Sequence, residues 1–317
     1  MAISGSYNYS LARDDILTEA LQIVGVVGEN SSPTASQLTD YSRTLNILVK
    51  SVMAEPGVLL WKNTPTAIFL VKDQAQYVLK ASSGARACLL TDYVKTELNG
   101  SHAANATSLT VDSTTGMTAA DVIGIEETDS TITWTTISSV DSSTTLTIGS
   151  GLDSICADNN NVYTYTTAVI YKPTGITNAY LRSDDDNDSE LRIYSREEYM
   201  SLTQKTSSGD PLCVYVEPKL NSLEINVWPV PSDVDSVLVC ALQYPIADFD
   251  AATDDMDFPI EWGKYLVYQL AADAGEKAMI PERKQNRLDA KAEFLKQILL
   301  DFSTETTSLY LRPAQGF

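Results

Sequence analysis

The sequence predicts an α+β protein, in which a four-helix body with a small antiparallel β region carries an inserted all-β module. Three observations predict this class. Apolar residues recur at helical spacing near both ends of the chain, short alternating runs occupy its middle, and residues 97–167 are crowded with serine, threonine and asparagine. The predicted domains are a discontinuous body over residues 1–96 and 168–302, a β module over 97–167 and an extended tail over 303–317.

Two helices are predicted near the N-terminus, over residues 10–27 and 35–54, because each stretch has one apolar stripe. Ser10 can cap the first helix. Thr34 and Gln37 have the spacing of a capping box at the start of the second helix.

The next runs, "TAIFLV" (66–71) and "QYVLK" (76–80), are predicted to be the strands of a hairpin. The β module then departs after "ACLLTDYVK" (87–95), and the chain returns at "AVIYK" (168–172). Departure and return between two strand-like runs are typical of a domain inserted at an exposed loop.

The last third of the chain is predicted to return to the main body. Strands are expected near 190–196, 213–217, 222–228 and 236–244, followed by helices over 259–279 and 282–301. The stretch "LEINVWPVPSD" ends one strand at Trp228, Pro229 and Pro231, since proline cannot donate a ladder hydrogen bond. Trp228 is expected to plug that strand end against the helical body.

The charge balance disfavours binding to polyanions. The chain of 317 residues has 22 basic and 42 acidic side chains, a formal net charge of −20. Such a surface repels nucleic acid. No apolar run approaches the ~18 residues of a membrane span, and the N-terminal residues lack the features of a signal peptide.

Four cysteines lie far apart in the sequence and form no C-x-x-C pair: Cys88, Cys156, Cys213 and Cys240. They are predicted to be buried, reduced thiols, which fits synthesis in a reducing cytoplasm.

Catalytic and cofactor motifs are sparse. His102 is the one histidine, so a histidine-dependent triad or a multi-histidine metal site is disfavoured, and His102 is expected to be a surface residue. No phosphate-cradling glycine motif and no nucleophile elbow occurs. The chain is therefore predicted to be no enzyme and to hold no cofactor.

One acidic run, "SDDDNDSE" (183–190), partly matches a calcium loop. Asp184, Asp186 and Asp188 occupy its first three ligand positions, but serines stand where the loop needs glycine and glutamate. A solvated acidic turn is the favoured interpretation, and weak cation binding is the alternative.

A second acidic run, "DFDAATDDMDFP" (248–259), precedes a predicted helix and favours its dipole without a metal. Paired carboxylates for glycoside hydrolysis stay open among 42 acidic residues, although nothing in the sequence singles out a pair.

Several short motifs follow one another between residues 190 and 300: "SREEY" (195–199), Lys205, Gly209, Pro211, Tyr215, Pro218, "WPVP" (228–231), "YPIADFD" (244–250) and "DFPIEW" (257–262). In order and spacing they resemble the head-to-tail adaptor proteins of tailed bacteriophages, especially short-tailed ones. The resemblance extends more loosely to the N-terminal helices and leaves out the β module. Its structural residues are Tyr199, Trp228, Pro229, Pro231, Tyr244, Pro245, Phe249, Phe258, Pro259 and Trp262.

The resemblance implies a virion structural protein without a catalytic site, assembled in the host bacterial cytoplasm and located in the neck or tail of the virion. It implies a ring of identical subunits, a dodecamer, that docks under the portal protein after DNA packaging. The ring would extend the DNA channel, pass double-stranded DNA without specific binding, and offer a surface to tail nozzle or tail fibre proteins. No membrane partner is implied.

The C-terminal tail is expected to bind the portal or a neighbouring subunit. It combines Leu309, Tyr310, Leu311, Arg312 and Phe317 without a helical period. Extended segments of this kind gain main-chain hydrogen bonds at a partner's sheet edge or lie in its groove. A disordered end is the alternative.

Two other functions stay open. A receptor- or glycan-binding tail component would use the Ser/Thr-rich β module. A cell-wall hydrolase would use two carboxylates.

Overall fold

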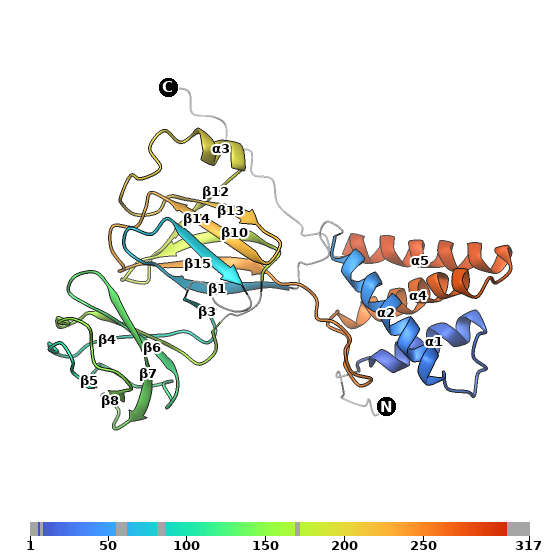
Figure 1. Ribbon diagram of the computed structural model, residues 1–317, viewed down its shortest axis with the longest axis horizontal. Coiled ribbons are helices and arrows are strands. Elements are labelled where there is room, and N and C mark those ends of the chain that lie inside the picture. Colours follow the sequence, from blue (N-terminus) through green and yellow to red (C-terminus); the bar gives the residue numbers. More distant parts are fainter. Residues whose placement is uncertain (1–5, 7–8, 55–61, 81–85, 169–171, 303–317) are drawn as a thin grey trace, which may run out of the picture. The chain divides into compact units, whose positions relative to one another are not determined.

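The computed structural model describes residues 6, 9–54, 62–80, 86–168 and 172–302, and in these residues strands dominate (Figure 1). This part of the chain contains fifteen strands in three sheets and five α-helices. The predicted α+β class with a four-helix body is therefore wrong: the structure is mostly β. The strands were underestimated because many contain only three to five residues, too few to display a clear alternation.

The chain forms two compact units. The helical unit comprises Met1–Trp61 and Ile246–Phe317, and the β unit comprises Lys62–Pro245. The predicted domains were different: the helices and the strands on either side of residues 97–167 were placed in one body, and residues 97–167 in a separate module. In the structure, those strands and residues 97–167 belong to the same unit.

The helical unit contains α1 (Arg13–Val24), α2 (Ala35–Val52), α4 (Gly263–Lys277) and α5 (Glu282–Phe302). A short 3-10 turn, η2 (Ile260–Trp262), directly precedes α4. One face of each helix contributes to a shared apolar core, in which Leu17, Leu45, Leu266 and Leu270 are fully or almost fully buried. Burial of these stripes holds the helices together, since isolated helices of this length are marginal in water.

Local signals set some of the helix ends. Gln37 N donates to Thr34 Oγ1 over 3.4 Å and Thr34 N donates to Gln37 Oε1 over 2.8 Å, so the predicted capping box is confirmed. Ser10 does not cap α1, because the helix begins at Arg13 and the Ser10 hydroxyl donates to Asp255 Oδ1 over 2.8 Å.

The β unit is built from three sheets whose strands are mostly non-consecutive neighbours (Figure 1). The five-stranded sheet has the order β11 (Asp188–Glu190), β10 (Gly175–Arg182), β15 (Val237–Gln243), β1 (Asn63–Phe69) and β3 (Ala87–Leu89). The four-stranded sheet has the order β12 (Arg192–Tyr194), β13 (Cys213–Pro218), β14 (Ser222–Trp228) and β2 (Gln76–Lys80), and α3 (Arg196–Ser201) follows β12.

The six-stranded sheet has the order β4 (Val94–Glu97), β9 (Asn161–Tyr165), β6 (Val122–Glu126), β7 (Ile132–Val140), β8 (Thr145–Ile148) and β5 (Ser108–Thr110). It is antiparallel throughout and has an apolar core of its own on one face, with Leu109, Ile123 and Ile125 fully buried.

The predicted hairpin of residues 66–80 does not form. β1 pairs with β15 and β3, whereas β2 pairs with β14 in a different sheet. Side chains of the two sheets, among them Ile68, Leu79 and Leu238, meet in a common core. The two strands are therefore neighbours in sequence that pack face to face rather than edge to edge.

An aromatic core joins the six-stranded sheet to the five-stranded sheet. The ring of Phe69 on β1 lies 4.9 Å from that of Trp134, 5.3 Å from that of Tyr163 and 5.8 Å from that of Tyr165. Val237 and Val239 of β15 belong to the same cluster. The residues expected to form an inserted module thus share a core with strands outside it.

Candidate interaction surfaces

The described residues show few groupings suited to catalysis. All four cysteines are free and buried, as predicted. His102 is half-buried, and its Nε2 accepts a hydrogen bond from Thr110 N over 3.3 Å, so it is not the plain surface residue that was expected. Among the described residues, no three His, Cys, Asp or Glu side chains could together hold a metal ion.

The acidic run 183–190 forms the turn after β10 (183–187) and the strand β11 that follows it. Ser183 N donates to Asn187 O over 3.0 Å. Arg182 Nε pairs with Asp188 Oδ1 over 2.8 Å, and Lys95 Nζ pairs with Asp184 Oδ1 over 3.0 Å. These basic partners favour the solvated acidic turn over a cation site.

The "SREEY" motif forms α3 and its attachment. Ser195 and Glu198 make a capping box, in which Ser195 N donates to Glu198 Oε2 over 2.7 Å. The ring of Tyr199 stacks on that of Tyr215 at 5.0 Å, and Lys205 Nζ lies 5.7 Å from the centre of the Tyr199 ring. The motif therefore fixes a short helix against β13.

The "WPVP" motif holds the loop between α3 and β13. The indole Nε1 of Trp228 donates to Gln204 O over 2.8 Å, and the Trp228–Pro229 peptide is cis. Asp73 N donates to the carbonyl of the buried Pro231 over 2.9 Å. Trp228 thus contacts a loop of its own β unit.

The "YPIADFD" motif crosses from one unit to the other. The phenol oxygen of Tyr244 lies 3.3 Å from Thr66 Oγ1. Burial raises the pKa of Tyr244. Pro245 is the last residue of the β unit. Phe249 is buried in the helical core, and its backbone forms two hydrogen bonds with the Asn46 side chain, over 2.9 and 3.1 Å.

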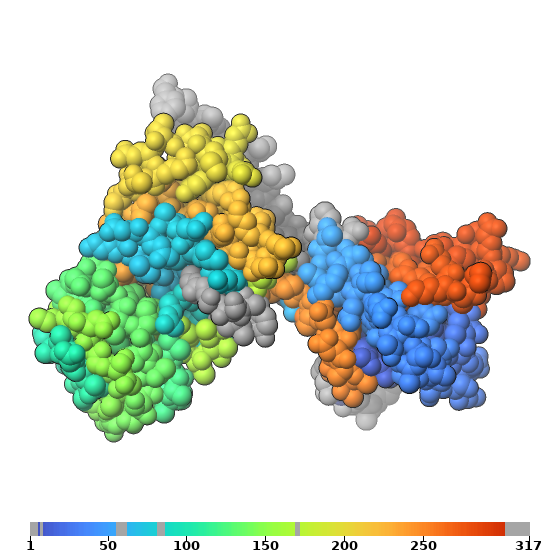
Figure 2. Space-filling model, in the orientation of Figure 1, coloured from blue at the N-terminus to red at the C-terminus, as the bar shows by residue number. Residues whose placement is uncertain are grey.

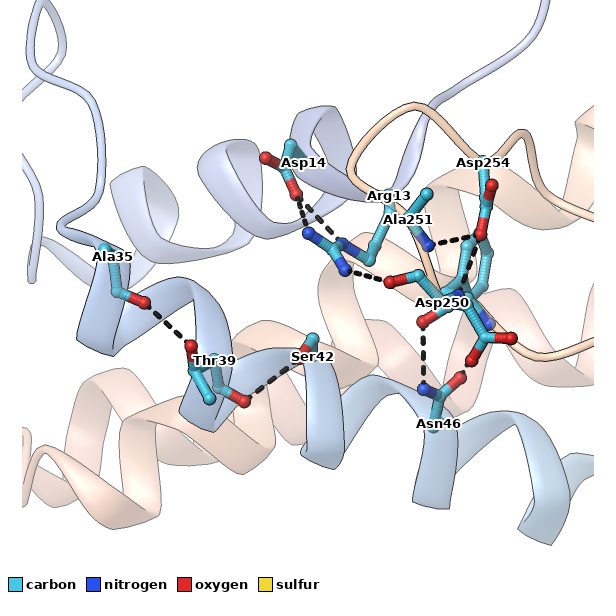
Figure 3. A network of polar contacts seen from close by, with 10 residues as sticks. Arg13, Asp14, Ala35, Thr39, Ser42, Asn46, Asp250, Ala251 and Asp254 are labelled. Atoms are coloured by element: carbon cyan, nitrogen blue, oxygen red, sulfur yellow. Dashed lines mark hydrogen bonds and ion pairs between the residues drawn. The ribbon is translucent and has the colours of Figure 1, made fainter.

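Figure 3 shows how Arg13 and Asp254 hold the segment that follows. Arg13 Nη1 donates to Asp250 O over 2.9 Å, while its Nη2 pairs with Asp14 Oδ1 over 2.9 Å. Asp254 Oδ2 accepts from the backbone nitrogens of Asp250 and Ala251 over 2.8 and 2.6 Å. These hydrogen bonds hold residues 250–254 in a defined loop against the start of α1.

The "DFPIEW" motif begins the last helix pair. Phe258 and Trp262 are buried in the helical core with ring centroids 5.9 Å apart. Pro259 precedes the 3-10 turn η2, and α4 begins only at Gly263, later than the predicted start at 259.

The predicted partner-binding residues Leu309, Tyr310, Leu311, Arg312 and Phe317 lie outside the described residues.

Near the start of α1 lies a surface that we call the acidic end, which comprises Asp250, Asp254, Asp255 and the apolar Ile260. There, Arg13 N donates to Asp254 O over 2.9 Å. Asp250 also lines a pocket with the basic residues Arg43 and Lys50. Asp250 and Asp255 are exposed, and Ile260 is 40% exposed. Within the described residues, none of the three aspartates forms an ion pair with a basic side chain.

A groove of about 1000 Å³ along the first half of α5 has the opposite charge. We call it the basic groove: Arg283, Lys284, Arg287 and Lys291, flanked by Phe294. Lys284 Nζ donates to Val24 O at the end of α1 over 2.7 Å, and Lys291 Nζ lies 5.3 Å from the Phe294 ring centre. Among the described residues, Arg283 and Arg287 have no carboxylate partner.

The sequence analysis did not identify this groove. The signal was present in the spacing of Arg283, Arg287 and Lys291, four residues apart and therefore on one side of the helix. The sequence did not show that Ile23 and Tyr268 from two other helices close the groove.

In the β unit, the structure brings together two carboxyl groups that the sequence did not pair, those of Glu126 and Asp235. They lie within hydrogen-bonding reach of each other, and Glu126 Oε2 also accepts from Asn161 Nδ2 over 2.9 Å. Burial, followed by smaller contributions that include Asp235, raises the pKa of Glu126 to about 7. The pKa of Asp235 is also raised, first by burial and then by the nearby negative charge of Asp233.

Two carboxyl groups this close share one proton. Glycosidase pairs are separated by about 5 Å or more, which leaves room for the sugar or for water. This pair is therefore arranged as a contact between β6, where Glu126 is half-buried, and the turn before β15, where Asp235 is exposed.

No protein-family model and no curated protein sequence matches the chain. None of the helices in the described segments has the length and apolar character of a bilayer-crossing helix.

Proposed function

We propose that the protein is a structural component of a tailed-bacteriophage virion, a head-to-tail adaptor that forms a ring under the portal. The observation that supports this proposal is the structural role of the motifs through which the sequence resembles such adaptors. They build a helix attachment, a loop anchor, the crossing between the two units and the start of α4, and none of them contributes a reactive group. Residues of this kind define the shape of a scaffold.

In this proposal the ring is a dodecamer that docks after DNA packaging, extends the DNA channel and presents a surface to tail nozzle or tail fibre proteins. It acts without catalysis and without a cofactor. The net charge of −20 supports the passage of DNA, because an acidic surface does not retain phosphates. The protein is assembled in the host bacterial cytoplasm and remains in the neck or tail of the virion.

The test is reconstitution with the portal protein of the same virus. Portal rings are mixed with the purified protein and imaged by electron cryomicroscopy, and a second ring stacked on the portal is expected. Mass spectrometry of purified virions should detect the chain at a fixed ratio to the portal. Absence from virions, or portal rings that remain bare, would rule the function out.

The proposed docking residues Leu309, Tyr310, Leu311, Arg312 and Phe317 have their own test. Truncation after Asp301 should leave the melting temperature unchanged and weaken portal binding at least about tenfold, equivalent to about 1.4 kcal/mol. Undiminished binding by the truncated protein would reject these residues and leave the ring proposal standing.

Glycan binding by a tail component is a second candidate, and one groove favours it. The groove has a volume of about 850 Å³ and is lined by Tyr180, Tyr194, Glu190 and Arg192 among other residues. Aromatic and charged side chains together can hold a polar ligand. Binding of host surface polysaccharide, lost on Tyr194→Ala, would support this candidate over the adaptor.

A further inference from the structure

Opposite charges occupy the two ends of α1. The acidic end is joined to the start of α1, through the Arg13 N–Asp254 O hydrogen bond and the bridge between Ala12 and Asp255. The basic groove is joined to its last turn, through Lys284 Nζ and Val24 O. α1 has 12 residues, so the two surfaces lie roughly 18 Å apart along the helix axis.

Figure 2 shows the orange surface of the segment after Ile246 and the red surface of α5 in different parts of the helical unit. Both surfaces belong to one unit of the chain, so their separation follows from contacts inside that unit.

Each surface also has an exposed apolar residue at its edge. Phe294 is 54% exposed beside the basic groove, Ile298 on the next turn of α5 is 48% exposed, and Ile260 at the acidic end is 40% exposed. Apolar side chains of this size next to charges are typical of protein–protein contacts. A phosphate backbone would match the charge of the groove but not Phe294 and Ile298.

We propose that the basic groove of one copy binds the acidic end of a second copy. The partner must be acidic and carry an apolar edge, and Asp250, Asp255 and Ile260 of an identical chain meet both conditions. Two different surfaces on one unit form a heterologous, head-to-tail contact, and such contacts close into a ring when the rotation between copies allows it. The inference rests on the proposed ring and names the surfaces that would build it.

A charge-swap experiment tests the contact. In one variant the groove is reversed by Arg283→Glu and Arg287→Glu; in the other the acidic end is reversed by Asp250→Lys and Asp255→Lys. Each variant alone brings like charges together and should self-associate at least about tenfold more weakly than the wild type in sedimentation velocity at low salt. An equimolar mixture restores opposite charges at every contact and should recover wild-type association.

The matched control is Lys72→Glu with Arg196→Glu. Both residues are exposed in the β unit, and the pair changes the net charge by the same amount as the groove variant. Its self-association should equal that of the wild type. Far-ultraviolet circular dichroism of all variants verifies that they are folded.

A second measurement detects a weak contact directly. Carbodiimide joins carboxylates to lysines at zero length, so a mixture of unlabelled and isotope-labelled chains should yield intermolecular peptides that link Lys291 or Lys284 to Asp250 or Asp255. The same peptides should disappear in the groove variant, which keeps Lys284, Lys291, Asp250 and Asp255.

Three results would overturn the proposal: a wild type that neither self-associates nor cross-links, a groove variant that associates like the wild type, or a mixture that fails to recover. Binding of a short DNA duplex that is lost with Arg283→Glu and Arg287→Glu, without self-association, would instead make the groove a phosphate site. Portal docking is measured separately, so failure of this contact leaves the proposed function intact.

Discussion

The side-chain amide of Asn46 anchors the segment that leaves the β unit. Its Nδ2 donates to Phe249 O and its Oδ1 accepts from Phe249 N, over 3.1 and 2.9 Å. Phe249 is thereby held in the helical core by its side chain and by both of its backbone polar groups.

Asn46→Ala should lower the free energy of unfolding of the helical unit by about 1–3 kcal/mol, because two part-buried backbone groups lose their partner. Ile47→Ala is the matched control, since Ile47 follows in the same helix and is 64% exposed. Chemical denaturation followed by circular dichroism measures both. Equal stability of the two variants would show that water replaces the amide at no cost.

The shared proton of Glu126 and Asp235 makes the β unit sensitive to pH. The folded-state pKa of Glu126, about 7, is higher than its ordinary value of 4.5. The folded state therefore binds more protons than the unfolded state between these values, and stability should fall as the pH rises from about 4.5 to about 7.

Glu126→Gln should remove much of this pH dependence, because the amide keeps an acceptor for Asn161 and donates to Asp235 without titrating. Asp235→Asn should act in the same direction. Thermal unfolding at a series of pH values measures the slope. A slope in either variant as steep as in the wild type would mean that the pair does not share a proton.

At the scale of the element, Gly124 shows why β6 and β7 fit together. A Cβ at this position would lie 2.6 Å from Trp134 Cζ3, so the indole ring rests on the backbone of the neighbouring strand. The ring in turn packs against Phe69.

Gly124→Ala should cost about 1–3 kcal/mol of stability by displacing Trp134 from the aromatic core. Gly28→Ala is the control, because its nearest contact would be Ser31 Oγ at an ordinary 3.6 Å. Trp134 fluorescence during unfolding reports on the affected site. A melting temperature equal to that of the wild type would show that the indole has room to shift.

Deletion of residues 100–165 tests whether the six-stranded sheet can be separated from its neighbour. The deletion would expose Phe69, Val237 and Val239 to water, so we expect aggregation or loss of cooperative unfolding. Size-exclusion chromatography and thermal melting distinguish the outcomes. A soluble deletion variant with a sharp transition would mean that the aromatic core is dispensable.

Sequence patterns predicted local features well and long-range pairing poorly. The capping box of Thr34 and Gln37 depends on residues three apart, so it can be read directly. β1 and β2 were assigned to one hairpin because they are adjacent in sequence, but β1 pairs with β3 and β15, and β2 pairs with β14. β15 and β14 lie more than 140 residues further on. Nothing in a single strand identifies such a partner.

The candidate surfaces could not be predicted from the sequence for the same reason, because they also depend on long-range contacts. The charges of Arg283, Arg287 and Asp250 are visible in the sequence, yet their placement at opposite ends of α1 follows from hydrogen bonds between residues more than 200 positions apart.

At the scale of the whole molecule, the two units have separate apolar cores. Leu17, Leu45 and Leu266 belong to the core of the helical unit, whereas the cores around Ile68 and Phe69 lie in the β unit. A chain with separate cores can unfold in separate steps.

The fragment Lys62–Pro245 should therefore fold alone. Its two ends already meet, since Tyr244 N donates to Lys62 O over 3.2 Å. The amide resonances of the fragment should overlay those of the same residues in the full chain. Collapsed, poorly dispersed resonances would show that the β unit needs the helices.

This meeting of the chain ends determines how the β unit would respond to a mechanical load. β1 and β15 are antiparallel, and Asn63 is paired with Gln243 beside the two tethers. A force transmitted through the tethers pulls the two strands apart from one end, so their hydrogen bonds would open one after another, as in a zipper, rather than together, as in shear. Tension would therefore unravel the β unit from Asn63 and Gln243 inward, and would reach the Phe69 ring last.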